Sequence, residues 1–162
     1  MARFTRTAEG EAATAVVLET FRANGLLLAA GDVLAAEEGL TSARWQVLGA
    51  VALAERPLTV SQIARRMGLT RQSVQASVNR LISEELVEAD ENPDHRRSPL
   101  VRLTELGTRK YARLEPRQTK WINELAAGLT VADLSTAARV LQELSSRLNT
   151  KRSETADRNV TP

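Results

Sequence analysis

Apolar residues recur at helical spacing along most of this chain, and the starts of the helices are marked by a repeated Leu-Thr pair. A threonine at such a point can accept a hydrogen bond from the free backbone N–H groups of the first helical turn. The pair occurs at residues 40–41, 58–59, 69–70, 103–104 and 129–130. In four cases an apolar residue follows the leucine at the spacing of a hydrophobic staple, namely Trp45, Ile63, Val74 and Leu134. Thr59 with Gln62, and Thr130 with Asp133, also have the spacing of a capping box.

These signals and the spacing of the apolar positions predict a mainly helical chain with one pair of strands. The helices are expected at residues 11–38, 42–55, 60–67, 71–84, 105–126 and 131–148. Pro116 is expected to bend the fifth of them. LVEAD (86–90) and PLVRL (99–103) are predicted to be strands joined by an Asn-Pro-Asp turn, which makes a hairpin. The polar end of the chain, 150–162, is expected to be disordered.

Composition narrows the class of protein. A chain of 162 residues suits one domain with extensions, and 43% apolar but only 3% aromatic residues predict a core of Leu, Val and Ala, which favours helices. The absence of cysteine excludes disulfides, thiolate metal sites and thiol redox sensing. No apolar run is expected to reach the roughly 18 residues of a membrane span, and the first residues lack the apolar stretch of a signal peptide. We therefore expect a soluble cytoplasmic protein without a metal or cofactor.

Charge is unevenly distributed, although the net charge is only +2. Residues 1–55 carry four basic and seven acidic side chains, whereas residues 56–80 carry five arginines and no acid. Such a segment is expected to face an anionic partner. The alternative at this stage is an ordinary solvated face.

Residues 58–81, LTVSQIARRMGLTRQSVQASVNRL, have the pattern of a helix-turn-helix. Ala64 lets two helices approach, Gly68 can adopt a positive φ at the turn, and Val74 wedges the second helix in place. The inward side of that helix is predicted to be Val74, Val78, Leu81 and Ile82. The outward side carries Arg, Gln and Asn, which can hydrogen-bond base edges in a major groove, and the helix start offers free N–H groups to a phosphate. A generic helical hairpin with a polar surface is the alternative.

Residues 92–103, NPDHRRSPLVRL, place two adjacent arginines at the tip of the predicted hairpin. A helix-turn-helix followed by a two-stranded hairpin is a winged helix, and this loop is then the wing. A wing lies over a minor groove, whose narrow A·T stretches attract arginine. We therefore expect Arg96 and Arg97 to be unpaired within the chain, and Asp94 to cap the turn or to orient Arg96.

From LTSARWQVLG (40–49) through the helix-turn-helix to PDHRRSPLVRLTELG (93–107), the chain resembles the multiple-antibiotic-resistance regulator (MarR) family. The most specific motif is Asp94-x-Arg96-Arg97 followed by Val101-x-Leu103-Thr104-x-x-Gly107. The resemblance implies a mainly α fold with a small β-hairpin wing, in which long flanking helices make a dimer. It also implies a repressor that binds pseudo-palindromic double-stranded DNA and is commonly released by a small, often aromatic, ligand.

Three positions depart from the family pattern. Glu85 stands where the family usually has glycine, and a positive φ there costs roughly 1 kcal/mol. Ala89 replaces a common basic residue, which removes a phosphate contact. Asn79 stands where an acid is frequent, which disfavours an internal ion pair with the wing. These departures bear on the DNA contacts rather than on the fold.

The candidate DNA-binding residues lie on the two predicted helices and the wing: Arg65, Arg66, Thr70, Arg71, Gln72, Ser73, Gln75, Asn79, Arg80, Arg96 and Arg97. One winged helix makes too few base contacts for operator specificity, so a homodimer that reads two half-sites is expected. Apolar stripes on the first and the last two helices favour that assembly over purely internal packing. We therefore expect a dimerisation helix at 1–40, a winged lobe at 41–104, dimerisation helices at 105–149 and a tail at 150–162.

A site for an effector, a small aromatic or apolar ligand, is expected where the dimer helices meet the winged lobe, at Arg44, Trp45 and Leu28. A core position is the alternative for Trp45, because it forms a staple with Leu40. Without cysteine, regulation is expected to be reversible ligand binding that favours a non-binding spacing of the recognition helices. His95 is expected to be a solvated wing residue rather than a pH switch.

An enzyme is not expected, because one histidine, no cysteine and no glycine-rich phosphate loop leave few catalytic sets. The acidic residues also lack metal-ligand spacing. The competing hypothesis is a winged helix that serves as a protein-interaction module without specific DNA binding. The two hypotheses differ in salt dependence, since each phosphate contact with DNA releases counterions.

Overall fold

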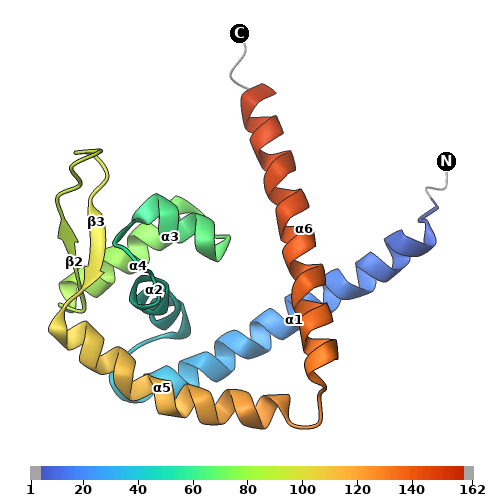
Figure 1. The fold of residues 1–162 in the computed structure, drawn as a ribbon, viewed down its shortest axis with the longest axis horizontal. Helices are drawn as coiled ribbons and strands as arrows, with labels where there is room; N and C mark the ends of the chain where they lie inside the picture. Colours follow the sequence, from blue (N-terminus) through green and yellow to red (C-terminus); the bar gives the residue numbers. More distant parts are fainter. Residues whose placement is uncertain (1–4, 159–162) are drawn as a thin grey trace. The chain divides into compact units, whose positions relative to one another are not determined.

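The computed structural model describes residues 5–158, with side chains as far as Thr150. Its elements are α1 (Ala8–Ala35), the 3-10 helix η1 (Ala36–Glu38), α2 (Ser42–Ala52), β1 (Leu58–Thr59), α3 (Val60–Met67), α4 (Arg71–Ser83), β2 (Val87–Asp90), β3 (Leu100–Leu103), α5 (Glu105–Ala126) and α6 (Val131–Arg158). The chain divides into two compact units, one ending at Gln118 and the other beginning at Thr119. The first unit contains α1 to α4, the sheet and the start of α5 (Figure 1).

The helix starts predicted from the Leu-Thr pairs are confirmed. The threonine hydroxyl in each of the five pairs accepts a hydrogen bond of 3.0–3.4 Å from the backbone N–H three residues on. At Thr59 the capping box is complete, because Gln62 Oε1 also accepts from the Thr59 N–H at 2.8 Å. At Thr130 the return contact is between side chains, with the hydroxyl donating to Asp133 Oδ2 at 2.6 Å. These local bonds fix where each helix begins.

Several helix ends differ from the predicted ones. Helix α1 starts earlier, at Ala8, because Thr7 caps it and accepts from the Gly10 N–H at 3.1 Å. Helix α2 ends at Ala52, and α5 continues through Pro116. The backbone of α6 is helical to Arg158, beyond the predicted end at residue 148, so the first part of the tail expected to be disordered is helical. The rest of that tail, 159–162, lies outside the described residues.

The sheet has three antiparallel strands in the order β1-β3-β2. The predicted hairpin is confirmed, with Val87 opposite Leu103 and Asp90 opposite Leu100. Strand β1 was not predicted; it pairs Leu58 with Val101 on the other side of β3. Since β1 leads directly into α3, the base of the wing is tied to the start of the helix-turn-helix.

The core is built from small and branched aliphatic residues, as the composition predicted. Its fully buried side chains include Leu48, Ile63, Val74, Val78, Leu81, Leu86, Val87, Val101 and Leu114. Leu114 belongs to α5, so the first turns of that helix pack onto the winged lobe. Trp45 and Tyr111 are partly buried against the same core. Gly107 lies so close to the backbone of Leu86 that a Cβ there would come within 1.9 Å of the Leu86 carbonyl oxygen.

Helix α1 exposes an apolar surface. Its exposed large apolar side chains are Val17, Leu18, Phe21, Leu26, Leu27 and Val33. By length and composition, Ala8–Glu38 is long and apolar enough to cross a membrane, with a mean hydropathy of 1.2, which corrects the expectation that no segment would be. One such helix is weak evidence of a span, and Glu19 and Arg22 carry opposite charges 3.8 Å apart within it. Charged groups are costly at the centre of a bilayer.

Candidate nucleic-acid interface

The helix-turn-helix forms as the spacing predicted. Helix α3 ends at Gly68, which has a φ of 66°, and the Leu69 N–H donates to the Ala64 carbonyl at 3.0 Å. Beyond its chain neighbours, no atom of the described residues lies within 4 Å of the position that a Gly68 Cβ would take, so glycine is needed for its backbone conformation and not for space. Thr70 then caps α4, and Val74 is fully buried against α3 and α2. The turn thus sets the angle at which α4 is presented.

Helix α4 has one buried and one exposed face. Val74, Val78 and Leu81 are buried as predicted, whereas Ile82, placed inward by its spacing, is 39% exposed. The expectation for Ile82 was wrong because it follows the fully buried Leu81, and one residue of helix turns the side chain about 100° away from the buried face. The predicted outward residues Arg71, Gln72, Ala76, Asn79 and Arg80 are exposed, with Thr70 and Ser73 beside them. Gln75 is half-buried, and its Nε2 donates to Asn79 Oδ1 at 2.8 Å, so these two residues are oriented by each other.

Five exposed arginines share one property: within residues 5–150 none of them has an ion-pair or side-chain hydrogen-bond partner. They are Arg65, Arg66, Arg71, Arg96 and Arg97. Arg56, exposed in the segment before β1, also lacks such a partner in that range, whereas the remaining described arginines of the same unit are paired. Arg102 on β3 donates to Asp90 at 2.5 Å and to Glu88 at 3.2 Å across the strands of the wing. Uncompensated positive charge therefore lies on α3, at the start of α4 and at the wing tip, with Arg56 before β1 in addition.

The wing tip is shaped by Asn92, a residue that the sequence analysis did not single out. Asn92 is 7% exposed; its Nδ2 donates to the Ser98 carbonyl at 2.8 Å, and its Oδ1 accepts from the Asp94 N–H at 3.1 Å. The backbone adds a bond from the Ser98 N–H to the His95 carbonyl at 2.9 Å. Asp94 was expected to shape this tip, but in the structure it contributes its backbone N–H and not its carboxylate. The signal in the sequence was the Asn-Pro pair, since asparagine commonly bonds to backbone two residues on.

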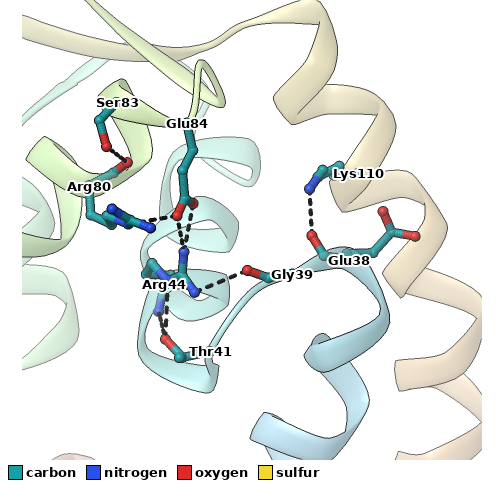
Figure 2. Close-up of polar contacts among 8 residues, drawn as sticks. All are labelled: Glu38, Gly39, Thr41, Arg44, Arg80, Ser83, Glu84 and Lys110. Carbon is teal, nitrogen blue, oxygen red and sulfur yellow. Dashed lines mark hydrogen bonds and ion pairs between the residues drawn. The ribbon is translucent and has the colours of Figure 1, made fainter.

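Arg80 differs from the five free arginines. Its Nε donates to Glu84 Oε1 at 2.7 Å, and the same carboxylate is bound by Arg44 from α2 (Figure 2). Arg44 and Glu84 are forty positions apart in the sequence, and the pattern of the sequence gave no indication of their contact. The structure therefore separates Arg80 from the other basic residues predicted to contact DNA.

Two of the three residues named for an effector site have internal partners. Arg44 is engaged with Glu84, with the Gly39 carbonyl at 3.0 Å and with Thr41 Oγ1 at 3.4 Å. Trp45 packs against the core, as the alternative interpretation held. Leu28 is half-buried on α1. Within the described residues, the contacts of Arg44 join α2 to the end of α4, so this side chain helps to hold α4 in place.

Comparison with known proteins places this fold in a family. A family model described as MarR family matches residues 38–98, which span the helix-turn-helix and most of the wing. The uncharacterized protein Rv2011c of Mycobacterium tuberculosis is 42% identical over 137 residues, covering 85% of this chain and 94% of that protein. The chain belongs to the MarR family.

Solved structures share the fold of this MarR-family chain. The Mycobacterium tuberculosis transcriptional regulator MOSR, solved in complex with DNA, is 23% identical with a TM-score of 0.71, covering 84% of this chain and 97% of that chain. PcaV from Streptomyces coelicolor, solved with its natural ligand, is 26% identical with a TM-score of 0.63, covering 76% and 89%. The family and the fold are those of transcriptional regulators, which are not enzymes.

Proposed function

We propose that this MarR-family chain is a sequence-specific DNA-binding regulator, a repressor that binds pseudo-palindromic operators as a cytoplasmic homodimer. The observation that carries the proposal is the set of five exposed arginines without an internal partner on α3, α4 and the wing. Apart from these five and Arg56, the described exposed arginines of the same unit pair with carboxylates, as Arg109 does with Glu105 at 3.5 Å. Leaving these five unpaired is consistent with an anionic partner.

The chemistry at each position suggests a role in that interface. Arg65, Arg66 and Arg71 would contact phosphates, which supply affinity without reading sequence. Gln72 and Gln75 on α4, together with Asn79, can hydrogen-bond base edges in a major groove. The start of α4, at Thr70 and Ser73, offers N–H groups to a phosphate. Arg96 and Arg97, presented by the braced wing, would enter a narrow minor groove.

Apolar surfaces support the homodimer. Phe21 on α1 is 71% exposed and Leu148 on α6 is 68% exposed, in a chain with few aromatic residues. Exposed apolar side chains repeated along a helix favour burial against another surface. A second copy of the chain would bury these faces and would bring two winged lobes to two half-sites about one helical turn apart.

A small aromatic or apolar effector is part of the proposal. PcaV was solved with its natural ligand, so the same fold accepts small molecules in that protein. In this chain the region near Leu28 and Trp45 is the place to look, because Arg44 is already bound to Glu84 and to the Gly39 carbonyl. Such an effector would act by binding better to the dimer spacing that does not fit DNA.

Selection of bound duplexes from a random pool tests the proposal, because an operator with dyad symmetry reports DNA binding, specificity and dimer symmetry together. On the selected duplex we expect Arg96→Ala to weaken binding most where the site is flanked by A·T pairs, and Arg65→Ala to weaken it evenly. Arg109→Ala is the matched control, since it removes an exposed arginine that is already paired on α5. If no duplex is enriched, the proposal is contradicted. If Arg96→Ala and wild type bind A·T-flanked sites with equal affinity, the proposed role of the wing is contradicted.

A further inference from the structure

Glu84, at the end of the recognition helix α4, is shared by two arginines. Arg44 Nη1 donates to both of its carboxylate oxygens, at 2.6 Å for Oε2, and Arg80 Nε donates to Oε1 at 2.7 Å (Figure 2). Two cations thus converge on one anion.

The two arginines are not equivalent. The side chains of Arg44 and Glu84 are 17% and 23% exposed, whereas that of Arg80 is 65% exposed. Arg44 is also held by the Gly39 carbonyl and by Thr41, so it fixes Glu84 in place. The segment that holds Arg44 is itself fixed, because Lys110 donates a hydrogen bond to the carbonyl of Glu38, the residue before Gly39, at 2.5 Å. Glu84 is therefore a stationary carboxylate, and Arg80 is the partner that can leave.

We propose that Glu84 withholds Arg80 from DNA, so that Arg80 does not contribute a phosphate contact although it lies on the recognition helix. The proposal rests on the proposed function. A phosphate would have to replace the Glu84 carboxylate at Arg80, and the displaced carboxylate would remain nearby as a like charge. The bond from Arg80 to Glu84 and a bond from Arg80 to a phosphate are both charge-assisted. Replacing the first with the second therefore gains little. The chain thereby limits its affinity for the DNA backbone while its free arginines keep theirs.

The salt dependence of binding to one duplex tests this role, because its slope counts phosphate contacts. We compare wild type with Glu84→Gln, which retains an acceptor for Arg44 but loses the charge that holds Arg80. Each added contact steepens the slope of log affinity against log salt by about 0.9, and a symmetric dimer adds two. Glu85→Gln is the matched control, because it removes the same charge from the adjacent exposed residue, which has no side-chain partner within residues 5–150. We expect the steeper slope for Glu84→Gln and an unchanged slope for Glu85→Gln.

Two alanine variants complete the design. Arg71→Ala should make the slope shallower, whereas Arg80→Ala should not, and adding Arg80→Ala to Glu84→Gln should remove the gain. Three results would each overturn the role of Glu84. The first is an equal slope for Glu84→Gln and wild type, and the second is an equal effect of Glu85→Gln. The third is a shallower slope for Arg80→Ala alone. A thermal melt shows whether Glu84→Gln is folded; if it is not, the comparison of Arg80→Ala with Arg71→Ala still decides. Failure of the wild-type chain to bind any duplex refutes the proposed function itself, and this role with it.

Discussion

Glu85 connects the recognition helix to the wing in a backbone conformation that suits glycine. Its φ is 56°, and among the described residues it is the only one other than glycine with a positive φ. The Glu85 N–H donates to the Ile82 carbonyl and the Leu86 N–H to the Leu81 carbonyl, both at 2.9 Å, which is the pattern of a Schellman cap. The Thr104 hydroxyl donates to the Glu85 carbonyl at 2.6 Å. Three bonds thus hold an L-residue in the left-handed region, and Glu85→Gly should relieve the strain.

The size of the gain follows from two opposing terms. An L-residue in the left-handed region costs about 1–2 kcal/mol, whereas the greater freedom of glycine in the unfolded chain costs about 0.5–1 kcal/mol. The Glu85 side chain is exposed and has no partner within residues 5–150, so its loss should be neutral. The two ranges give a net stabilisation between about 0 and 1.5 kcal/mol. We expect the midpoint, about 0.75 kcal/mol, which corresponds to a rise in Tm of about 1.5–3 °C for a chain of this size.

Urea denaturation at a fixed protein concentration measures this gain, because a shift in midpoint at constant slope is a change in stability. Glu85→Ala is the control: it removes the carboxylate but keeps the Cβ, so it should match wild type. DNA affinity should be unchanged in both variants. A Glu85→Gly protein no more stable than Glu85→Ala would show that the turn is not strained, and the reasoning from its φ would be refuted.

Two further predictions concern the wing and the core. Asn92→Ala should lower affinity for the operator several-fold with little loss of fold stability, because Ser98 loses its brace and the wing arginines lose their fixed position; in a double-mutant cycle the loss should vanish when Arg96 is already alanine. Asn92→Asp, which cannot donate to the Ser98 carbonyl, should behave like alanine. Burial, with a smaller contribution from the Glu115 carboxylate, raises the pKa of Tyr111. Absorbance at 295 nm of this single tyrosine should therefore titrate above the usual value of about 10, and the stability that its neutral form provides should be lost as pH rises through that raised pKa; a midpoint at or below the usual value would contradict the burial of the ring.

The features predicted well from the sequence are those decided within a few residues. The Leu-Thr starts, the Gly68 turn and the wing hairpin depend on capping and turn chemistry that acts over three or four positions. The departure at Glu85 belongs to the same class, because one missing glycine in a helix-ending position is visible in the sequence alone.

The features that were missed depend on pairings between distant segments. Strand β1 is two residues long and exists because Leu58 lies beside Val101, which no local pattern shows. The binding of Glu84 by Arg44 joins α4 to α2. Asn92 and Asp94 are both common turn residues, and only the path of the loop decides which side chain turns inward.

Thr59 takes part in two bonding systems at once. Its side chain opens α3, and its backbone lies opposite Leu100 on the returning strand of the wing. Helix α3 and the wing that carries Arg96 therefore cannot shift relative to each other unless the capping box or the pairing of β1 with β3 breaks. In a dimer, each winged lobe would therefore adjust to the operator as a rigid body. The conformational change would lie in the chain outside residues 58–103.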